Sequence, residues 1–255
     1  MKKPLLIDLD GVLKIGNSPA PGLQIFFDYL KNSGRPAVII SNTTLNHADI
    51  VKSFFTRIST PLPVDILTAA DATALYVKKH YSKAAVFCTD VVLPIFDGVL
   101  DYNYPEVVVM GDLGKNWDFN TLNKIFLFVN GGADLIAMQK NKFWSTPEDG
   151  MLLDLGPFVS AIEYATGKKA ILIGKPSPLY FEAGMNLLGK SLQDGFYMLG
   201  DDLQNDIIGA QNIGGSGILI LTGKTKPPLD EKIQIIPDYV TKDLFSVTEL
   251  LEKLP

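Results

Sequence analysis

The sequence predicts an α/β protein with a doubly wound, Rossmann-like parallel-sheet core and a second α/β domain inserted into it. Short apolar runs alternate with segments of helical period along the 255 residues, a pattern typical of βαβ units. Four of these apolar runs end in polar side chains. Since ligands bind beyond the carboxyl ends of the strands in an open parallel sheet, these endings predict a site at that edge.

The elements near the N-terminus follow from local apolar patterns. Residues 4–7 form an apolar run that predicts a buried strand, and Asp8 ends it. Residues 22–34 predict a helix, because apolar side chains recur at helical spacing and a glycine follows as a stop signal. Residues 37–40 predict the next strand, which leads into the polar segment "SNTT" at 41–44.

The C-terminal part repeats the alternation of strands and helices. Its predicted elements are a strand at 170–173 before "GKPSP", a helix at 179–189, a strand at 196–200 before "DDLQND", a helix at 206–214 and a strand at 217–223. Together with the N-terminal elements, they predict a core built from residues 1–74 and 171–255.

The stretch between "SNTT" and "GKPSP" is far longer than a connection between neighbouring strands needs to be. It has its own alternation, with predicted helices at 71–79, 119–130 and 157–166 and predicted strands at 84–88, 106–111 and 135–138. We therefore expect residues 75–170 to form an inserted α/β cap domain. Because both crossings into the insert lie near the predicted site, we expect the cap to close over it as a lid.

Composition argues against several classes of partner and location. The net charge of −5 and the pI near 5.1 argue against nucleic acid and anionic membranes as partners. Apolar runs stay well short of the roughly 20 residues needed to span a bilayer. Asp8 and Asp10 interrupt the apolar stretch after "MKK", so we do not expect secretion. Cys88 is the single cysteine, which excludes an intramolecular disulfide and predicts a cytoplasmic location.

The four polar strand ends complement one another chemically. They carry Asp8 and Asp10, Ser41 and Asn42, Lys175, and Asp201 and Asp202. Hard oxygen donors favour Mg²⁺, which usually takes one or two protein carboxylates together with substrate phosphate. Asp8 and Asp201 suit that number, and the backbone carbonyl of Asp10 completes the protein's share.

The same residue types suit phosphoryl chemistry. A carboxylate nucleophile forms an aspartyl-phosphate and divides the reaction into two steps. Lys175 adds a second positive charge, while Ser41 and Asn42 offer hydrogen-bond donors to the phosphoryl oxygens. A carboxylic acid two residues from the nucleophile is placed to protonate the leaving oxygen and then to deprotonate the attacking water. The residues alone thus predict Mg²⁺-assisted phosphoryl chemistry.

Four segments, in this order, resemble the motifs of the haloacid dehalogenase superfamily of phosphohydrolases: "DLDGVL", "SNTT", "GKPSP" and "GDDLQNDIIGAQNIG…ILILTGK". The length and position of the insert resemble the branch with a large α/β cap of the NagD type. "DGMLLDLGPFVSAIEYATGKKA" is similar to the group of haloacid-dehalogenase-like hydrolase domain-containing proteins and phospholysine phosphohistidine inorganic pyrophosphate phosphatases. The resemblance spans nearly the whole chain.

The resemblance implies a role for each matching residue. Asp8 is implied as the nucleophile and a metal ligand, and Asp10 as the acid/base whose main-chain oxygen also binds Mg²⁺. Lys175 is implied to stabilise the phosphorylated aspartate, and Asp201 to hold the metal. Some relatives have serine in place of the second aspartate of the first motif. This chain keeps Asp10, which favours an active enzyme.

The remaining motif residues are implied to support these. Ser41 and Asn42 match the positions that bind phosphate. Asp206 matches the second acidic position of the last motif, and we expect it to act through water or from behind the direct ligands. Asp202 and Asn205 either do the same or only shape the loop.

The cap departs from the family pattern. Its segment "AMQKNKFWSTPEDG" lacks the Asn-x-Asp pattern of many other NagD-type members, so their substrates do not carry over to this chain. One hypothesis places Lys142, Phe143 and Trp144 on a surface that selects the leaving group. The alternative is a surface hairpin with an aromatic side chain packed on the cap. By analogy we also expect the strand edges of the cap to form a homodimer.

The segment "TGKTK" resembles the end of a phosphate-binding P-loop. However, Ile218 stands where that loop requires glycine, and a predicted strand occupies the place of the loop. The P-loop interpretation is therefore set aside.

Together these observations predict a Mg²⁺-dependent phosphatase of small phosphorylated metabolites, with inorganic pyrophosphate and phosphoamino acids as further candidates. A phosphotransferase would share every core residue and differ in its acceptor. A non-catalytic phospholigand-binding or scaffolding protein remains the alternative of a different class, although such a protein needs no nucleophile–acid pair. A dehalogenase suits the metal loop and the large cap less well.

Overall fold

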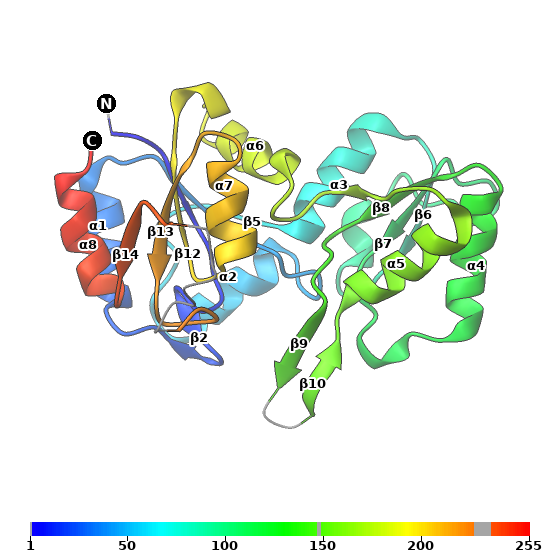
Figure 1. The fold of residues 1–255 in the computed structure, drawn as a ribbon, viewed down its shortest axis with the longest axis horizontal. Helices are drawn as coiled ribbons and strands as arrows, with labels where there is room; N and C mark the ends of the chain where they lie inside the picture. The colour runs from blue at the N-terminus through cyan, green and yellow to red at the C-terminus, as the bar shows by residue number, and fades with distance from the viewer. Residues whose placement is uncertain (1, 147–148, 227–235) are drawn as a thin grey trace. The chain divides into compact units, whose positions relative to one another are not determined.

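The computed structural model describes residues 2–146, 149–226 and 236–255, and the chain divides into two compact units. The first unit comprises Met1–Ser41, Asp49–Leu67 and Lys175–Pro255, and the second comprises Asn42–Ala48 and Thr68–Gly174. Both chain termini lie on the first unit (Figure 1). The predicted insert of residues 75–170 falls within the second unit, and its limits stay a prediction.

The first unit is built on a six-stranded sheet with strand order β14-β13-β12-β1-β4-β5. Its strands are β1 (Leu5–Ile7), β4 (Ala37–Ser41), β5 (Ile66–Thr68), β12 (Tyr197–Gly200), β13 (Ser216–Ile220) and β14 (Tyr239–Thr241). The pairings from β14 through β4 are all parallel. Strands β1, β4 and β12 are buried along their whole length, which explains why they appear in the sequence as continuous apolar runs.

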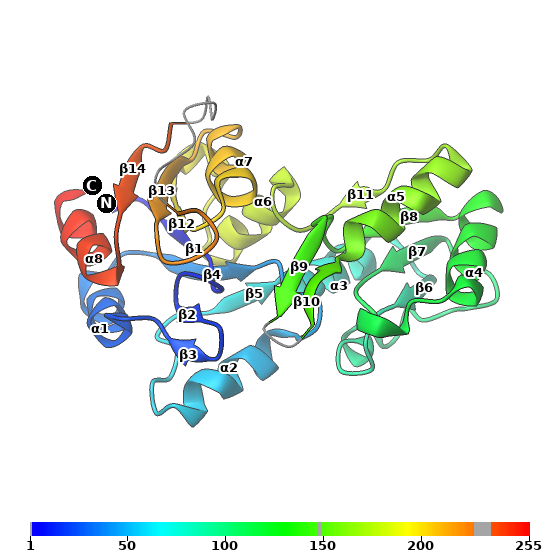
Figure 2. The ribbon, with the colours of Figure 1, turned by 60° about the horizontal axis from the view of Figure 1, so that its bottom comes forward.

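Helices cover both faces of this sheet, as a doubly wound fold requires (Figures 1 and 2). α1 (Leu23–Ser33) packs beside α8 (Leu244–Lys253) on one face, while α6 (Pro178–Leu187) and α7 (Gly209–Gln211) lie on the other. α1 buries the apolar residues whose spacing predicts it, and Gly34 ends it in the left-handed conformation that favours glycine, with φ 66°.

The second unit has a parallel sheet of its own, with strand order β11-β8-β7-β6. Its elements are the strands β6 (Ala84–Phe87), β7 (Val107–Met110), β8 (Asp134–Ala137) and β11 (Ile171–Leu172) and the helices α3 (Ala69–His80), α4 (Phe119–Asn130) and α5 (Leu155–Thr166). An antiparallel hairpin of β9 (Phe143–Thr146) and β10 (Gly150–Leu153) precedes α5. Both units alternate strands with helices, which confirms the predicted α/β class. The strand predicted at 170–173 as part of the core is wrong in its sheet, because β11 pairs with β8 and the next two backbone N–H groups, of Ile173 and Gly174, donate to the carbonyls of Ala137 and Met138.

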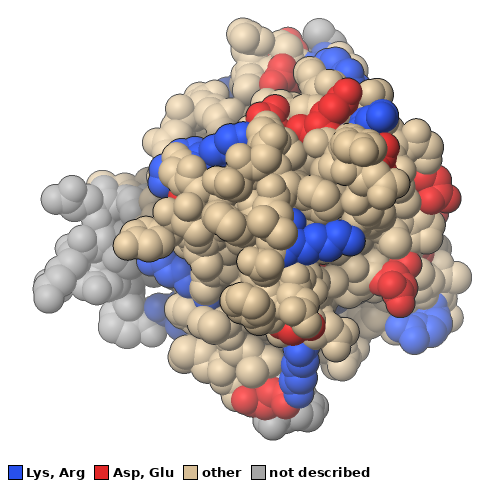
Figure 3. Space-filling model, turned by 90° about the vertical axis from the view of Figure 1, so that its right-hand side faces the viewer, with Lys and Arg blue, Asp and Glu red and all other residues tan. Residues whose placement is uncertain are grey.

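Charged side chains are spread over the surface drawn in Figure 3. Lys and Arg are scattered among Asp and Glu on that face and do not gather into one patch. Within the described parts of the chain, no helix combines the length and the apolar character needed to cross a membrane.

The helix predicted from residue 206 is wrong in its starting point. The structure has a π-helix at Leu203–Ile208 that continues into α7 and ends at Gln211. The earlier start has a local cause, because the Asp202 carboxylate accepts hydrogen bonds from the backbone N–H groups of residues 204 and 205, at 2.9 and 3.2 Å. Asp202 thus acts as a helix cap.

The strand predicted at 217–223 is too long. β13 ends at Ile220, and a turn follows it. The Leu221 N–H still donates to the Thr241 carbonyl of β14 at 3.0 Å, but the chain then turns away from β14: the Thr222 hydroxyl donates to the Gly11 carbonyl, and the Lys224 N–H donates to the Asp201 side chain.

A buried arginine ties together segments that lie far apart in the first unit. The Arg35 guanidinium donates to four backbone carbonyls at 2.8–3.1 Å, those of Lys3, Leu251, Leu254 and Pro255. Its Nε donates to the Tyr29 hydroxyl at 3.1 Å. All five N–H donors of the side chain therefore have acceptors, and the residue is only 3% exposed.

Replacing Arg35 with methionine should lower the free energy of unfolding by at least about 3 kcal/mol. Hydrogen bonds to charged groups contribute roughly 1.5–3 kcal/mol each, and the substitution removes all five. The Leu251 and Pro255 carbonyls keep the Tyr29 hydroxyl and the Lys3 N–H as donors, which limits the loss. Urea unfolding measures the change. The matched control is Arg57→Met at the exposed end of α2 (Ala48–Arg57), which should stay within about 0.5 kcal/mol. Equal losses in both variants would contradict the stabilising role of Arg35.

Candidate active site

The candidate site lies where β1, β12 and β4 end together. In the parallel register Ile7 pairs with both Leu199 and Ile39, so the residues that follow these positions emerge at one edge of the sheet. Asp8 follows β1 directly, and its backbone N–H donates to the Leu199 carbonyl at 2.8 Å. Asp201 follows β12 in the same way.

Lys175 contacts two carboxylates and a backbone carbonyl near the end of β4. Its Nζ lies 2.6 Å from Asp8 Oδ1 and 2.8 Å from Asp206 Oδ1. The same atom donates to the Ile40 carbonyl of β4 at 3.3 Å. Lys175, Asp8 and Asp206 are all buried. The ammonium is thus held between two acidic side chains away from bulk water.

Asp201 completes a group of three buried carboxylates. One oxygen from each of Asp8, Asp201 and Asp206 lies within 4.8 Å of the other two. Asp201 Oδ2 accepts a hydrogen bond from the Lys224 backbone N–H at 2.5 Å, and Asp206 Oδ2 accepts one from the backbone N–H of residue 202 at 3.1 Å. Three carboxylates outnumber the ammonium of Lys175, which leaves an excess of negative charge in a buried space.

Burial, with the neighbouring carboxylates, shifts the ionisation of the group. Burial raises the pKa of Asp8 well above its usual range; Asp206 and Asp201 add to the rise and Lys175 opposes it. Burial also raises the pKa of Asp206, and it raises the pKa of Asp201 to about 6. Burial alone would lower the pKa of Lys175, but the charges of Asp206 and Asp8 outweigh burial and raise that pKa. Added positive charge near the group would lower the pKa values of all three carboxyls.

The residues present fit a divalent metal ion. Asp8, Asp201 and Asp206 offer oxygen donors, and these atoms are close enough together for one ion to contact all three. Such an ion would also offset the excess negative charge, which adds to the effect of burial on the pKa values of Asp8 and Asp201. Asp206, which the sequence places behind the direct ligands, contacts Lys175 itself and belongs to the same group of carboxylates.

The raised pKa of Asp201 predicts that the metal-free protein gains stability as the pH falls. A carboxyl whose pKa is about 6 in the folded state, against 3.8 ordinarily, binds its proton more tightly when folded. Its contribution to stability is therefore full below the ordinary pKa and is lost as the pH rises through about 6. A difference of this size corresponds to about 3 kcal/mol at most.

Asp201→Asn removes that proton site and supplies the comparison. In protein treated with a chelator, wild type should gain about 2 kcal/mol of unfolding free energy relative to Asp201→Asn between about pH 7.5 and 4.5, since the full difference is reached only below the ordinary pKa. Urea unfolding at several pH values measures the gap. A gap that stays constant across this range would contradict the prediction.

Asp202 and Asn205 make their contacts within the loop that follows Asp201. Asp202 caps the helix and forms an ion pair with Lys224, whose Nζ lies 2.5 Å from Asp202 Oδ2. Asn205 Nδ2 donates to the same carboxylate at 2.9 Å. Although burial acts to raise it, the hydrogen bond and charge of Lys224 hold the pKa of Asp202 below its usual range.

The other three predicted site residues have different surroundings. The Asp10 carboxylate is 59% exposed and forms an ion pair with Lys14 at 2.5 Å. Ser41 is the buried last residue of β4. Asn42 belongs to the second unit, where its Oδ1 packs so closely against Gly174 that an added Cβ would lie 2.8 Å away. The roles predicted for these three residues stay predictions.

Sequence analysis missed two features of the site. The loop of Gly223 and Lys224 contacts Asp201, and its signal was "TGKTK", which follows an apolar run as the other motifs do. The second is the buried Tyr180, whose hydroxyl lies 2.6 Å from the Ser41 carbonyl oxygen and 2.8 Å from that of Leu67. No feature of the sequence around Tyr180 distinguishes it from an ordinary core residue.

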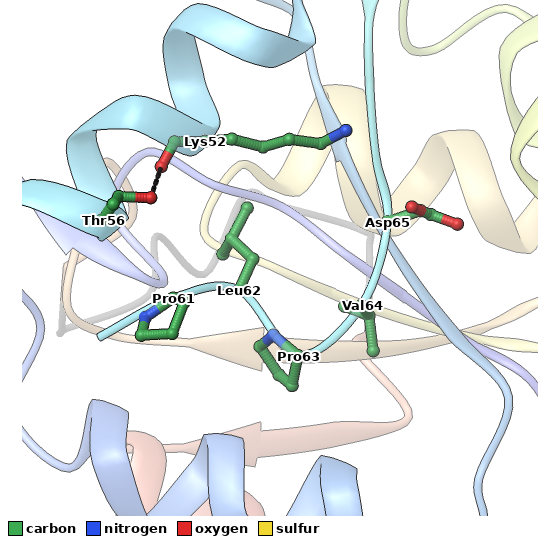
Figure 4. A pocket seen from close by; sticks show the side chains of 7 residues that line it. All are labelled: Lys52, Thr56, Pro61, Leu62, Pro63, Val64 and Asp65. Atoms are coloured by element: carbon green, nitrogen blue, oxygen red, sulfur yellow. Dashed lines mark hydrogen bonds between the residues drawn. The ribbon is translucent and has the colours of Figure 1, made fainter. Parts of the chain in front are cut away.

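A cavity of about 380 Å³ lies between α2 and the loop before β5 (Figure 4). Its lining residues are Lys52, Thr56, Pro61, Leu62, Pro63, Val64 and Asp65. Thr56 Oγ1 donates to the Lys52 carbonyl at 3.1 Å, and this bond is drawn in Figure 4. None of these residues belongs to the acidic cluster, so the cavity adds nothing to the chemistry described above.

Comparison with known proteins finds relatives along the whole chain. The family model for haloacid dehalogenase-like hydrolases matches residues 5–96, and a second, HAD-hydrolase-like model matches residues 172–247. Haloacid dehalogenase-like hydrolase domain-containing protein 2 of Homo sapiens is 32% identical over 99% of this chain and 97% of its own. Phospholysine phosphohistidine inorganic pyrophosphate phosphatase of Bos taurus is 28% identical over 97% of this chain and 93% of its own.

Solved structures share the fold. The p-nitrophenyl phosphatase of Archaeoglobus fulgidus superposes with a TM-score of 0.90 and is 25% identical in sequence. The match covers 98% of this chain and 99% of that one. The 4-nitrophenylphosphatase of Thermotoga maritima has a TM-score of 0.88 at 26% identity, with 97% of both chains covered. Because a relative above 30% identity matches it almost from end to end, the chain belongs to the haloacid dehalogenase-like hydrolase family, as its four motifs predict.

Proposed function

We propose that this phosphate-ester hydrolase is a Mg²⁺-dependent phosphatase that acts on small phosphorylated metabolites through an aspartyl-phosphate on Asp8. The observation that carries the proposal is the buried ion pair of Asp8 with Lys175, 2.6 Å long, beside two further carboxylates. A nucleophilic carboxylate repels a phosphate dianion by about 4 kcal/mol per charge pair at 4 Å and an effective dielectric of 20. A cation in contact with Asp8 reduces that repulsion.

The proposed reaction has two steps. In the first, a carboxylate oxygen of Asp8 attacks phosphorus and the bond to the leaving oxygen breaks, while Asp10 gives that oxygen a proton. In the second, Asp10 takes a proton from water, the hydroxide oxygen attacks phosphorus, and the bond to Asp8 breaks to release inorganic phosphate. Lys175 stays in contact with Asp8 and stabilises the negative charge that develops around it.

The acid/base role of Asp10 requires a movement. Its exposed carboxylate pairs with Lys14 at 2.5 Å, so the side chain has to leave Lys14 before it protonates a substrate oxygen. Ser41 and Asn42 are proposed to bind the phosphoryl oxygens. Catalytic hydrogen bonds often tighten only when substrate is present, so the Asp10 pair with Lys14 does not exclude this role.

The choice of Mg²⁺ follows from the donors. Asp8, Asp201 and Asp206 offer oxygen atoms only, which suit a hard divalent cation better than zinc or copper. They would hold the ion together with the backbone carbonyl of Asp10. When bound, Mg²⁺ supplies charge that screens the carboxylates from the phosphate dianion.

The substrate class is proposed from the relatives. The Bos taurus relative is named for phospholysine, phosphohistidine and inorganic pyrophosphate, and two structural neighbours are named for nitrophenyl phosphate. We propose small metabolite phosphates for this chain, with pyrophosphate and phosphoamino acids among the compounds to test. A cytoplasmic location and a homodimer stay predictions from the sequence.

Release of inorganic phosphate from p-nitrophenyl phosphate and a panel of metabolite phosphates tests the function. We expect turnover by wild type that requires Mg²⁺ and disappears with chelator. Analysis of the products in the presence of added alcohols separates hydrolysis from transfer to another acceptor. No turnover of any compound, with phosphate still raising the Tm, would overturn the proposal in favour of a phospholigand-binding protein.

The hypothesis that Trp144 helps to select the leaving group has its own test. Trp144 pairs with Leu152 in the β9–β10 hairpin. Trp144→Ala should change the ratio of kcat/KM between large and small substrates by about tenfold, the scale of one lost side-chain contact. Tyr164→Ala, which removes an aromatic residue that is 94% exposed on α5, is the control. An unchanged ranking of substrates in Trp144→Ala would contradict the hypothesis that Trp144 and the hairpin select the leaving group.

A further inference from the structure

We propose that the loop Thr222–Thr225 positions Asp201 for metal binding, with Gly223 and Lys224 as the positioning residues. The loop follows β13 and contains most of the "TGKTK" segment, which has no part in the catalytic steps above. The inference rests on the proposed function, because it takes Asp201 to be a metal ligand. What it adds to that function is a loop that fixes the position of the Asp201 carboxylate.

The loop is bonded to Asp201 through its backbone. The Lys224 N–H donates to Asp201 Oδ2 at 2.5 Å, and the Thr225 N–H donates to the Asp201 carbonyl at 3.1 Å. The Thr222 hydroxyl donates to the Gly11 carbonyl at 2.5 Å. The loop therefore ties the residue after β12 to the segment that follows Asp8 and Asp10.

Two glycines leave just enough room for the Asp201 carboxylate. A Cβ added at Gly11 or at Gly223 would overlap Asp201 Oδ2. A Cβ on Gly223 would also lie 2.8 Å from the Gly11 Cα, so the two glycine backbones face each other beside the carboxylate. Gly11 has φ +80° and needs glycine for its backbone as well, whereas Gly223 needs it only for space. Any side chain at 223 has to displace Asp201 or the loop.

Lys224 fastens the loop to the helix that carries Asp206. Its Nζ pairs at 2.5 Å with Asp202 Oδ2, and the same Asp202 carboxylate caps the helix at Leu203–Ile208. The lysine side chain is 60% exposed while that of Asp202 is only 14% exposed, so the pair closes the loop from the solvent side. The loop thus holds Asp201 in three ways: it bonds to the Asp201 carbonyl, it bonds to the Asp201 carboxylate, and it pairs with the adjacent Asp202.

The expected consequence is a loss of metal affinity. Residues that orient a metal ligand typically change affinity by about 10–100-fold when they are altered. Gly223→Ala displaces the carboxylate, and we expect the apparent Kd for Mg²⁺ to rise about tenfold or more. Lys224→Ala keeps the backbone N–H but removes the ion pair with Asp202, and we expect a rise of about tenfold.

The experiment measures Mg²⁺ affinity directly, from the rise in Tm over a titration of the full chain with Mg²⁺. Lys226→Ala is the matched control, since it removes an exposed lysine two residues further on. Lys224→Arg keeps a cation opposite Asp202 and should retain most of the affinity. Because Lys224 is exposed, the Tm of metal-free Lys224→Ala should stay close to that of wild type, which separates positioning from a loss of folding.

The outcomes distinguish the inference from the function on which it rests. Weaker Mg²⁺ binding by Lys224→Ala and Gly223→Ala, with Lys226→Ala unchanged, is the expected result. Wild-type affinity in folded Lys224→Ala would overturn the positioning role and leave the proposed function intact; this variant decides the matter even where Gly223→Ala does not fold. Failure of wild type to bind Mg²⁺ would overturn both.

Discussion

Replacing Asp8 with asparagine should lower kcat for phosphate release by on the order of 10⁴-fold or more. Removal of a nucleophile that forms the covalent intermediate typically costs this much, because an amide oxygen does not accept the phosphoryl group as a carboxylate does. Asparagine has nearly the same shape as aspartate, and Asp8 is buried beside Asp201 and Asp206. The neutral side chain should therefore leave the fold intact.

Phosphate release from p-nitrophenyl phosphate in saturating Mg²⁺ measures this effect. The matched control is Asp28→Asn, which neutralises an exposed carboxylate on α1 and should keep wild-type kcat. Stability supplies a second readout: since burial and the neighbouring charges raise the pKa of Asp8, the metal-free variant should be at least as stable as wild type at neutral pH. A folded Asp8→Asn variant with more than about a tenth of wild-type turnover would refute the nucleophile assignment.

Replacing Lys175 with methionine should lower the free energy of unfolding of the metal-free protein by about 3–5 kcal/mol at neutral pH. Removing one partner of a buried ion pair costs this much because a charge is left buried without compensation. Here the ammonium touches two carboxylates, at 2.6 Å for Asp8 and 2.8 Å for Asp206. Turnover should fall as well, since the variant has no cation in contact with the nucleophile.

A second substitution separates the two effects of Lys175. In Lys175→Met/Asp206→Asn one of the stranded carboxylates is neutral, so much of the lost stability should return, while turnover should stay low because Asp8 still lacks its cation. Urea unfolding and kcat for phosphate release give the two readouts. A Lys175→Met variant as stable as wild type at neutral pH would show that the ion pairs contribute no net stability.

Much of the core follows from the sequence because its strands are buried on both faces. Runs such as residues 37–40 are apolar throughout, and in the structure they belong to fully buried strands. Parallel strands start and end at the same edges of a sheet, so polar residues that follow these runs are expected near one another. The structure places Asp8 and Asp201 together at this edge. Lys175 contacts Asp8 as well, but the strand before it, β11, belongs to the sheet of the second unit, so its place does not follow from the ends of the core strands.

Other features depend on distances that no local pattern reports. Asp206 sits on a helix after a strand end, and its contact with Lys175 arises from where that helix begins, which Asp202 determines. The loop at Lys224 reaches Asp201 across the sheet edge. The same limit applies to Arg35, whose acceptors include Lys3 and Leu251 at opposite ends of the chain.

By itself the sequence determined the α/β class, the family and the strand ends that carry the acidic and basic side chains. These depend on residue type, apolar period and motif order, all of which are local. Only the tertiary structure decided that Lys175 pairs with two of three clustered carboxylates, that Asp10 pairs with Lys14, and that two glycines enclose Asp201. Ionisation and steric fit depend on burial and on separations of a few ångströms, and folding alone sets these, by bringing distant segments into contact.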